Sequence, residues 1–272
     1  AATITNGSTA AKTAYVVANV GTLANSPFAN VTTEADLKAV TGDLISGNAA
    51  TQTKNNLWMS GTDDITFSGT DGSVTVQLGF VAAKIELIVK DNRTNLTGGT
   101  IEITDENVVL LYAGKSGHFF GTAAEKVAQT AFYSGDASYP GFNSNIVTTS
   151  TALADAVSTP FTVNASNAVF NHFYTFGNNG ATQPTILAIQ SKRTVGGADE
   201  TIYYPIQFTV ADAGNTIEPG NAYTVTLTLN GDVSAGGGGG TTNPEQPLVK
   251  SQITVTVTAA TWLAKTVSKD FN

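Results

Sequence analysis

The stretch YTVTLTL, residues 223–229, decides the class of fold. Large apolar side chains alternate with threonine, so Tyr223, Val225, Leu227 and Leu229 would point to one side and the threonines to the other. Successive side chains of a β-strand point to opposite faces, and β-branched residues are common there. The stretch therefore predicts a β-strand with one buried face and one polar face.

Similar patterns occur along the whole chain, at Ser73–Leu78 (SVTVQL), Lys84–Val89 (KIELIV) and Ile253–Thr258 (ITVTVT). Sequences rich in turn-forming residues separate the strand candidates, at 70–73, 97–99, 177–180, 195–199 and 218–221. Helical patterns are scarce and short, at 32–40, with Thr33 as N-cap and Asp36 in the capping-box position, and at 122–132. Many short strands separated by turns predict an all-β fold made of β-sandwiches.

The strand patterns become sparse between about residues 114 and 160, where Gly, Ser, Ala and Asn prevail. We expect a domain boundary in this stretch, near residue 145. The predicted N-terminal sandwich is 1–145, and the C-terminal sandwich is 146–235 plus 241–272. Both have the size of an ordinary domain.

The C-terminal end of the chain combines a flexible tether with a strand. A run of five glycines, a spacer containing prolines and the alternating Ile253–Thr258 pattern follow one another. A strand that completes its own sheet needs only a turn before it. The tether therefore suggests that this strand can go elsewhere.

The composition limits the partners. The net charge is −8, only 12% of the residues are charged, and Lys and Arg are scattered singly. Nucleic acid and anionic membranes are therefore poor partners. No cysteine is present, which excludes disulfides and thiolate chemistry, and no run of 18 apolar residues occurs. We expect a mature protein that is not inserted in a membrane.

No catalytic, cofactor-binding or metal-binding residue is predicted. His118 and His172 lie far apart and outside any metal-binding spacing. Asp105 and Glu106 resemble a pair of hydrolytic carboxylates. Adjacent residues of a strand point to opposite faces, so solvated loop charges are the better interpretation.

Three aspartates, Asp63, Asp64 and Asp71, stand in the near-copies SGTDD and SGTDG around a short strand. Their carboxylates could meet at one end of a sandwich and hold Ca²⁺. Aspartate and glycine are also ordinary turn residues, and no EF-hand pattern is present. The turn role is therefore favoured.

Several segments, in their order and spacing, resemble the fimbrillins, the fimbrial subunits of Bacteroidales. They include Tyr-Tyr-Pro, an Asn-x-Tyr before a Thr-rich strand, Asn-Pro-Glu, and a last strand ending in Trp. These segments are PTILAIQSK at 184–192, TIYYPIQF at 201–208, IEPGNAYTVTLTLNG at 217–231 and TNPEQPLVKSQITVTVTAATWLAK at 242–265. Residues 13–21 and 74–89 match more loosely, and only residues 1–12 precede the first of these, where the family has more strand.

The resemblance implies two transthyretin-like β-sandwich domains and a subunit of a type V pilus. It implies a lipoprotein precursor, exported through the outer membrane, whose N-terminal segment is removed together with its first strand. A C-terminal segment then leaves its own subunit and fills the groove of the next one. The implied partners are identical subunits in a homopolymer, accessory anchor and tip pilins, and host or bacterial surface receptors.

On this basis the tail, about residues 249–272, is predicted to be a donor segment in two parts, about 251–258 and 261–267. The predicted groove-filling residues are Val249, Ile253, Val255, Val257, Trp262, Leu263 and Val267. The predicted hinge consists of Gly236, Gly237, Gly238, Gly239, Gly240, Pro244 and Pro247. Glycine removes stiffness, and proline keeps the spacer extended and out of any ladder.

The function predicted is that of a shaft pilin of cell-surface fimbriae, which polymerises by donor-strand exchange and supports adhesion and colonisation. One alternative is a monomeric surface adhesin or glycan-binding sandwich. Such a module more often exposes Trp and Tyr on a sheet face, whereas Trp58 and Trp262 stand in apolar, strand-like contexts. The other alternative, an enzyme, lacks convergent acidic residues.

Overall fold

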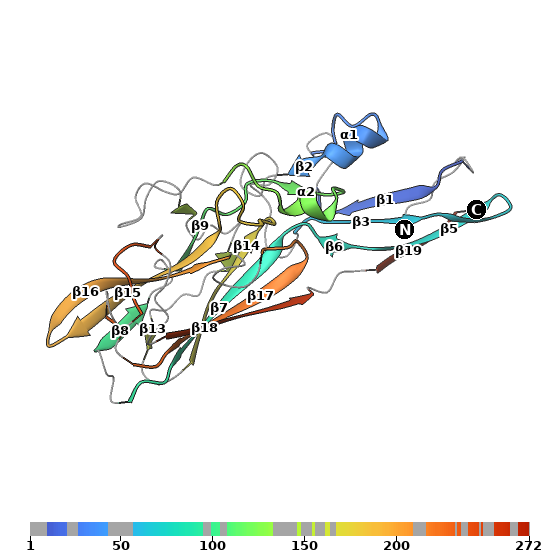
Figure 1. The fold of residues 1–272 in the computed structure, drawn as a ribbon. Coiled ribbons are helices and arrows are strands. Elements are labelled where there is room, and N and C mark those ends of the chain that lie inside the picture. Colours follow the sequence, from blue (N-terminus) through green and yellow to red (C-terminus); the bar gives the residue numbers. More distant parts are fainter. Residues whose placement is uncertain are drawn as a thin grey trace.

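A computed structural model describes most of the chain. The described residues are 10–20, 27–42, 57–94, 99–103, 108–132, 146–147, 154–155, 161–163, 167–208, 216–231, 233–234, 239–244, 246, 253–261 and 266–271. They form an elongated molecule of β-strands with two short helices (Figure 1). The all-β prediction is confirmed.

Two small sheets lie at one end of the molecule (Figure 1). The first has the order β1 (Thr13–Ala18), β3 (Met59–Asp64), β6 (Gly79–Phe80), and the second has the order β19 (Thr266–Phe271), β5 (Asp71–Gln77), β4 (Thr66–Ser68). Met59, Val74, Val76 and Leu78 form a core between these strands. Every second residue of β5 is buried, as its sequence alternation predicts.

Two larger sheets form the rest of the molecule. The five-stranded sheet has the order β12 (Ala154–Asp155), β14 (Asn167–Thr175), β7 (Ala83–Asp91), β17 (Asn221–Leu229), β18 (Ile253–Thr261). The six-stranded sheet has the order β11 (Ile146–Val147), β9 (Val108–Leu111), β15 (Ile186–Val195), β8 (Thr100–Ile103), β13 (Phe161–Val163), with β16 (Ala198–Gln207) on β15. All named strand pairs are antiparallel except β17–β7, which is parallel.

The main core lies between the larger sheets. The inward residues of β7 and β17 alternate with half-exposed ones, so Ile85, Leu87, Val225 and Leu227 have no exposed surface. Residues of the opposite sheet, such as Tyr204, belong to the same cluster. Burial of a side chain of this size contributes about 1.5–3 kcal/mol, so this layer is the main source of stability.

Two helices and a two-stranded sheet of β2 (Thr41–Gly42) and β10 (Gly117–His118) lie where the two sets of sheets meet. Helix α1 (Glu34–Ala39) begins with the predicted capping box, in which the Thr33 and Asp36 side chains each accept a backbone N–H. Hydrogen bonds from Thr33 and Thr32 hold the pKa of Asp36 below its ordinary value. Helix α2 (Ala123–Val127) has the same arrangement with Thr122 and Glu125.

Aromatic side chains fill this junction. The ring of Phe119 lies 4.8 Å from that of Phe28 and 5.3 Å from that of Trp58. Gly42 approaches the Trp58 ring so closely that an added Cβ would lie 2.0 Å from one of its carbons. The small and large sheets are therefore connected by close packing.

The strands are grouped differently from the predicted domains 1–145 and 146–235 plus 241–272. Strands β7, β8 and β9 precede residue 145, yet they pair with β14, β13, β15 and β17 in the larger sheets. A boundary near 145 would cut both larger sheets. The boundary was expected there because strand patterns are sparse between about residues 114 and 160, but this stretch supplies β11, which pairs with β9. The chain passes from the small to the large sheets between β6 and β7 instead.

Candidate assembly site

The first strand of the tail pairs with β17. The alternating sequence of β17 gives the predicted faces, because Tyr223, Val225, Leu227 and Leu229 are all buried. The Tyr223 hydroxyl accepts a hydrogen bond from the Glu218 backbone N–H at 2.8 Å and donates one to the Thr216 carbonyl at 2.9 Å. Burial raises the pKa of Tyr223, so it keeps its proton and both bonds.

The first tail strand, β18, lies along β17 in an unbroken register of nine residue pairs from Asn221↔Thr261 to Leu229↔Ile253. Val255 is opposite Leu227 and Val257 opposite Val225, and both valines pack half-buried against the main core. The side chains between them, Thr254, Thr256 and Thr258, are exposed. β18 is therefore an outer strand that covers one edge of the core.

The second tail strand, β19, pairs with β5 in the small sheets. The register runs from Thr266↔Gln77 to Phe271↔Gly72 and sets Val267 opposite Val76. The two tail strands thus complete two different sheets, β18 in the large set and β19 in the small set. Figure 1 shows them following one another along the same side of the molecule.

Part of the predicted hinge is held firmly against β16. The Thr241 and Tyr203 backbones exchange two hydrogen bonds of 2.9 Å, and the Thr241 hydroxyl bonds to the backbone of Asn243. Gly240 is buried, and an added Cβ would lie 2.1 Å from Ile202. Pro244 is buried too. Gly240 therefore serves close packing, because no other residue fits this approach.

Gly239, which precedes this contact, has a φ of 121°, a conformation open to glycine. The other hinge residues Gly236, Gly237, Gly238 and Pro247 lie outside the described residues, as do the predicted donor residues Val249, Trp262 and Leu263. Of the predicted donor residues, the structure places Ile253, Val255 and Val257 along the edge of β17 and Val267 along the edge of β5.

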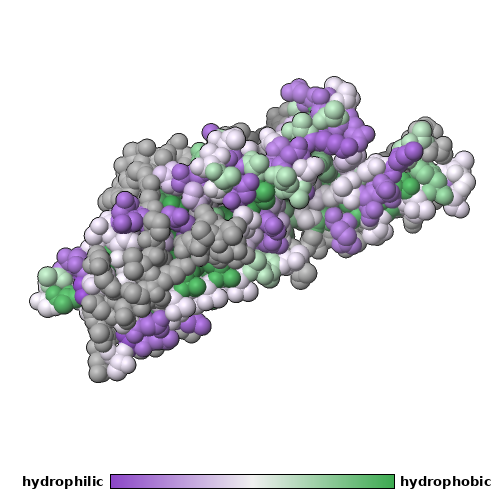
Figure 2. Space-filling model, viewed as in Figure 1, coloured by the Kyte–Doolittle hydropathy of each residue, from purple (hydrophilic) through white to green (hydrophobic). Residues whose placement is uncertain are grey.

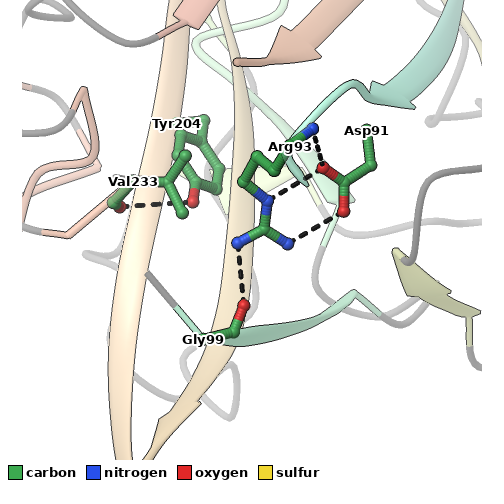
Figure 3. Close-up of polar contacts among 5 residues, drawn as sticks. All are labelled: Asp91, Arg93, Gly99, Tyr204 and Val233. Atoms are coloured by element: carbon green, nitrogen blue, oxygen red, sulfur yellow. Dashed lines mark hydrogen bonds and ion pairs between the residues drawn. The ribbon is translucent and has the colours of Figure 1, made fainter. Parts of the chain in front are cut away.

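A buried ion pair supports the end of β7, the strand on the other side of β17 (Figure 3). Arg93 donates to both carboxylate oxygens of Asp91, at 2.8 and 2.9 Å, and to the Gly99 carbonyl at 2.8 Å. Both side chains have no exposed surface, and Tyr204 lies beside them. The pair joins the end of β7 to the start of β8, and the sequence analysis missed it because charged residues are usually exposed.

The residues considered for chemistry are not brought together. Within the described ranges, no group of three or more His, Cys, Asp and Glu residues could hold a metal ion. The Asp63 and Asp64 carboxylates accept hydrogen bonds from the Asp64 N–H and the Thr13 hydroxyl, and that of Asp71 from Thr70. Residues 105 and 106 lie outside the described residues.

The two histidines are on separate strands, His118 in β10 and His172 in β14. At the junction, a Cβ added to Gly121 would lie 3.0 Å from the Cβ of His118 and 3.2 Å from that of Glu125. No helix in the described part of the chain is long and apolar enough to cross a membrane. On the visible face, apolar residues form small separate patches among polar ones (Figure 2).

These features define a class: all-β proteins with two packed sets of sheets, in which the strands of the C-terminal tail lie at sheet edges. Residues 82–262 match the family of FimA-like major fimbrial subunit proteins, C-terminal domain, and residues 1–72 match the major fimbrial subunit protein (FimA). The first match spans more than half of the chain. The chain belongs to the FimA-like major fimbrial subunit family.

Solved structures agree with this assignment. A candidate cell adhesion protein from Bacteroides eggerthii is 64% identical, with a TM-score of 0.77, over 95% of this chain and 80% of that chain. Two candidate cell adhesion proteins from Parabacteroides distasonis share the fold at TM-scores of 0.53. They are 16% and 15% identical, and cover 93% and 92% of this chain and 84% and 75% of theirs. A comparison with proteins of curated function gave no match.

The family confirms the fimbrillin resemblance. It assigns the chain to the structural subunits of the fimbriae of the cell surface. The two family matches are separated by residues 73–81, which contain most of β5 and all of β6, and the second match begins one residue before β7. The family division therefore follows the sheets.

Proposed function

We propose that this protein is a shaft pilin, which polymerises when its C-terminal strands pair with the neighbouring subunit. The observation that supports this is the position of the tail. Among the described strands, β18 and β19 are outer strands of two sheets, and each is hydrogen-bonded to one partner strand. A tail of identical sequence from another subunit can make the same pairings, so exchange needs no new kind of contact.

The contacts that the tail makes in one chain would then join two chains. β18 contributes nine residue pairs and two half-buried valines, and β19 contributes six residue pairs. A fully buried valine contributes about 1.5–3 kcal/mol, and the ladders must separate almost together. We expect a joint that opens very slowly.

The position of the exchange hinge follows from the docked Gly240–Pro244 segment. Because Thr241 is bonded to Tyr203, the moving part begins after this segment, and we place the donor within about residues 249–272. The subunit is exported as a lipoprotein precursor that loses its N-terminal segment on processing, and its β17 and β5 edges accept a donor once its own tail has left them. Anchor and tip pilins and surface receptors complete the assembly.

Removal of residues 249–272 tests this function. The truncated subunit keeps its acceptor edges but has no donor, so we expect folded, soluble subunits that form no filaments by electron microscopy and no ladder on unboiled SDS gels. Mixed with full-length subunits, it should end growing chains and shorten the filaments. SDS-resistant ladders from the truncated protein alone would contradict the proposal.

A further inference from the structure

Among the described residues, β18 has an outer edge that a further strand can pair with. β18 stands last in the five-stranded sheet, and no described strand pairs with its second edge. The side chains of Thr254, Thr256 and Thr258 are exposed, and β18 runs along the border of the molecule (Figure 1). An unpaired edge presents backbone N–H and C=O groups that can bond to a further strand.

This edge lacks the usual protection. Natural sheets protect such edges with charged residues, proline or β-bulges. Residues Ile253–Thr261 contain no charge and no proline, and their register with β17 has no shift. A second copy of this strand would therefore meet no like charge and no break in the ladder.

The sequence of the edge is complementary to itself. Residues 254–258 read Thr-Val-Thr-Val-Thr, the same in both directions. An antiparallel copy centred on Thr256 sets Thr254 opposite Thr258 and Val255 opposite Val257. Threonine then faces threonine on the exposed face, as it already does between β17 and β18, where Thr226 is opposite Thr256.

We propose that β18 pairs with β18 of a second copy of this chain, antiparallel and centred on Thr256, so that one sheet continues across two subunits. The tail can be folded onto its own β17 or supplied by a neighbouring subunit. In both cases the strand at this edge has the same sequence, so the pairing is the same whichever subunit supplies the tail.

The role of this pairing in a filament rests on the proposed function. There it would join two neighbouring filaments side by side. Its two-fold axis reverses the direction of the strand and of the whole subunit, so it joins filaments that run in opposite directions, as those of two facing cells do. A single edge contact is weak, but many of them along two filaments act together.

Single cysteines test the register, because the chain has none of its own. In Thr256→Cys, the two introduced thiols of a pair face each other, and mild oxidation of soluble subunits should give covalent dimers. In Thr254→Cys and in Thr258→Cys, each thiol lies four positions, roughly 13 Å, from its own copy. A mixture of these two variants should cross-link, because Thr254 faces Thr258.

We expect each of these two variants alone to cross-link at least about tenfold more slowly than Thr256→Cys, because strands separated by that distance cannot be bridged. Circular dichroism checks that all three variants fold. The pairing is overturned if Thr256→Cys stays monomeric, or if Thr254→Cys alone cross-links as fast. A chain that polymerises through its tail and still gives no Thr256→Cys dimer rejects this edge contact only.

Discussion

Adjacent residues of β17 have opposite surroundings. Leu227 has no exposed surface and belongs to the core between the larger sheets, whereas its neighbour Thr226 lies on the outer face beside Thr256. The same substitution at the two positions therefore has different consequences. At position 227 a carboxylate would be buried without a partner, which costs several kcal/mol, while at position 226 it would remain hydrated.

Leu227→Asp should therefore unfold the larger sheets. Domains are stable by only about 5–15 kcal/mol, so a buried unpaired charge removes much of the stability. Thermal unfolding followed by circular dichroism measures the effect, with Thr226→Asp as the matched control that stays close to the wild-type melting temperature. An unchanged melting temperature for Leu227→Asp would mean that the β17 faces are assigned incorrectly.

At the scale of elements, the tail has two strands, but both lie later than the predicted parts, about 251–258 and 261–267: β18 is Ile253–Thr261 and β19 is Thr266–Phe271. They differ in their surroundings. β18 covers an edge of the main core with Val255 and Val257, and β19 covers the β5 edge of the small sheets. Because the tail strands lie on the surface of two different sheets, a change in β18 can weaken tail binding without removing the core.

Val255→Asp should weaken the joint between subunits. The substitution places a carboxylate against the main core, where Val255 packs half-buried opposite Leu227. Thr256→Asp, one residue further, points to solvent and should polymerise nearly as well as the wild type. Filament yield by electron microscopy and ladders on unboiled SDS gels compare the two. Equal losses in both variants would argue against a groove-facing role for Val255.

The sequence predicted which residues form strands and which faces are buried, because alternation is local, as in β17 and β5. It did not predict the partners of the strands. Alternation fixes the face of Ile85, but not that β7 pairs with β17 in parallel across the intervening chain. It also could not separate two roles of glycine: Gly240 allows close packing rather than flexibility, and only the neighbouring Ile202 reveals this.

At the scale of the whole molecule, the tail spans both sets of sheets. Among the described strands, β18 is the last of the five-stranded sheet and β19 completes a sheet with β5 and β4. The small sheets near the beginning of the chain thus depend on its last residues. A single subunit closes this arrangement on itself, and a polymer would open it, so that each subunit completes its neighbour with the same registers.

Cysteine pairs at these registers distinguish the closed subunit from the exchanged one. Thr75 is opposite Ser268 in β5–β19, and Thr228 is opposite Thr254 in β17–β18. Antiparallel partners lie about 4.5–5.5 Å apart, within reach of a disulfide. In a monomer, oxidation of either double variant, Thr75→Cys with Ser268→Cys or Thr228→Cys with Thr254→Cys, should leave the mass unchanged. In filaments, exchange predicts that oxidation links different subunits, which gives a ladder on non-reducing, boiled gels.

A ladder with the first pair alone would show that only β19 crosses to the neighbour, and ladders with both pairs would show that the whole tail crosses. If oxidised filaments release only monomers with both pairs, the tail stays in its own subunit and donor-strand exchange through these registers is excluded.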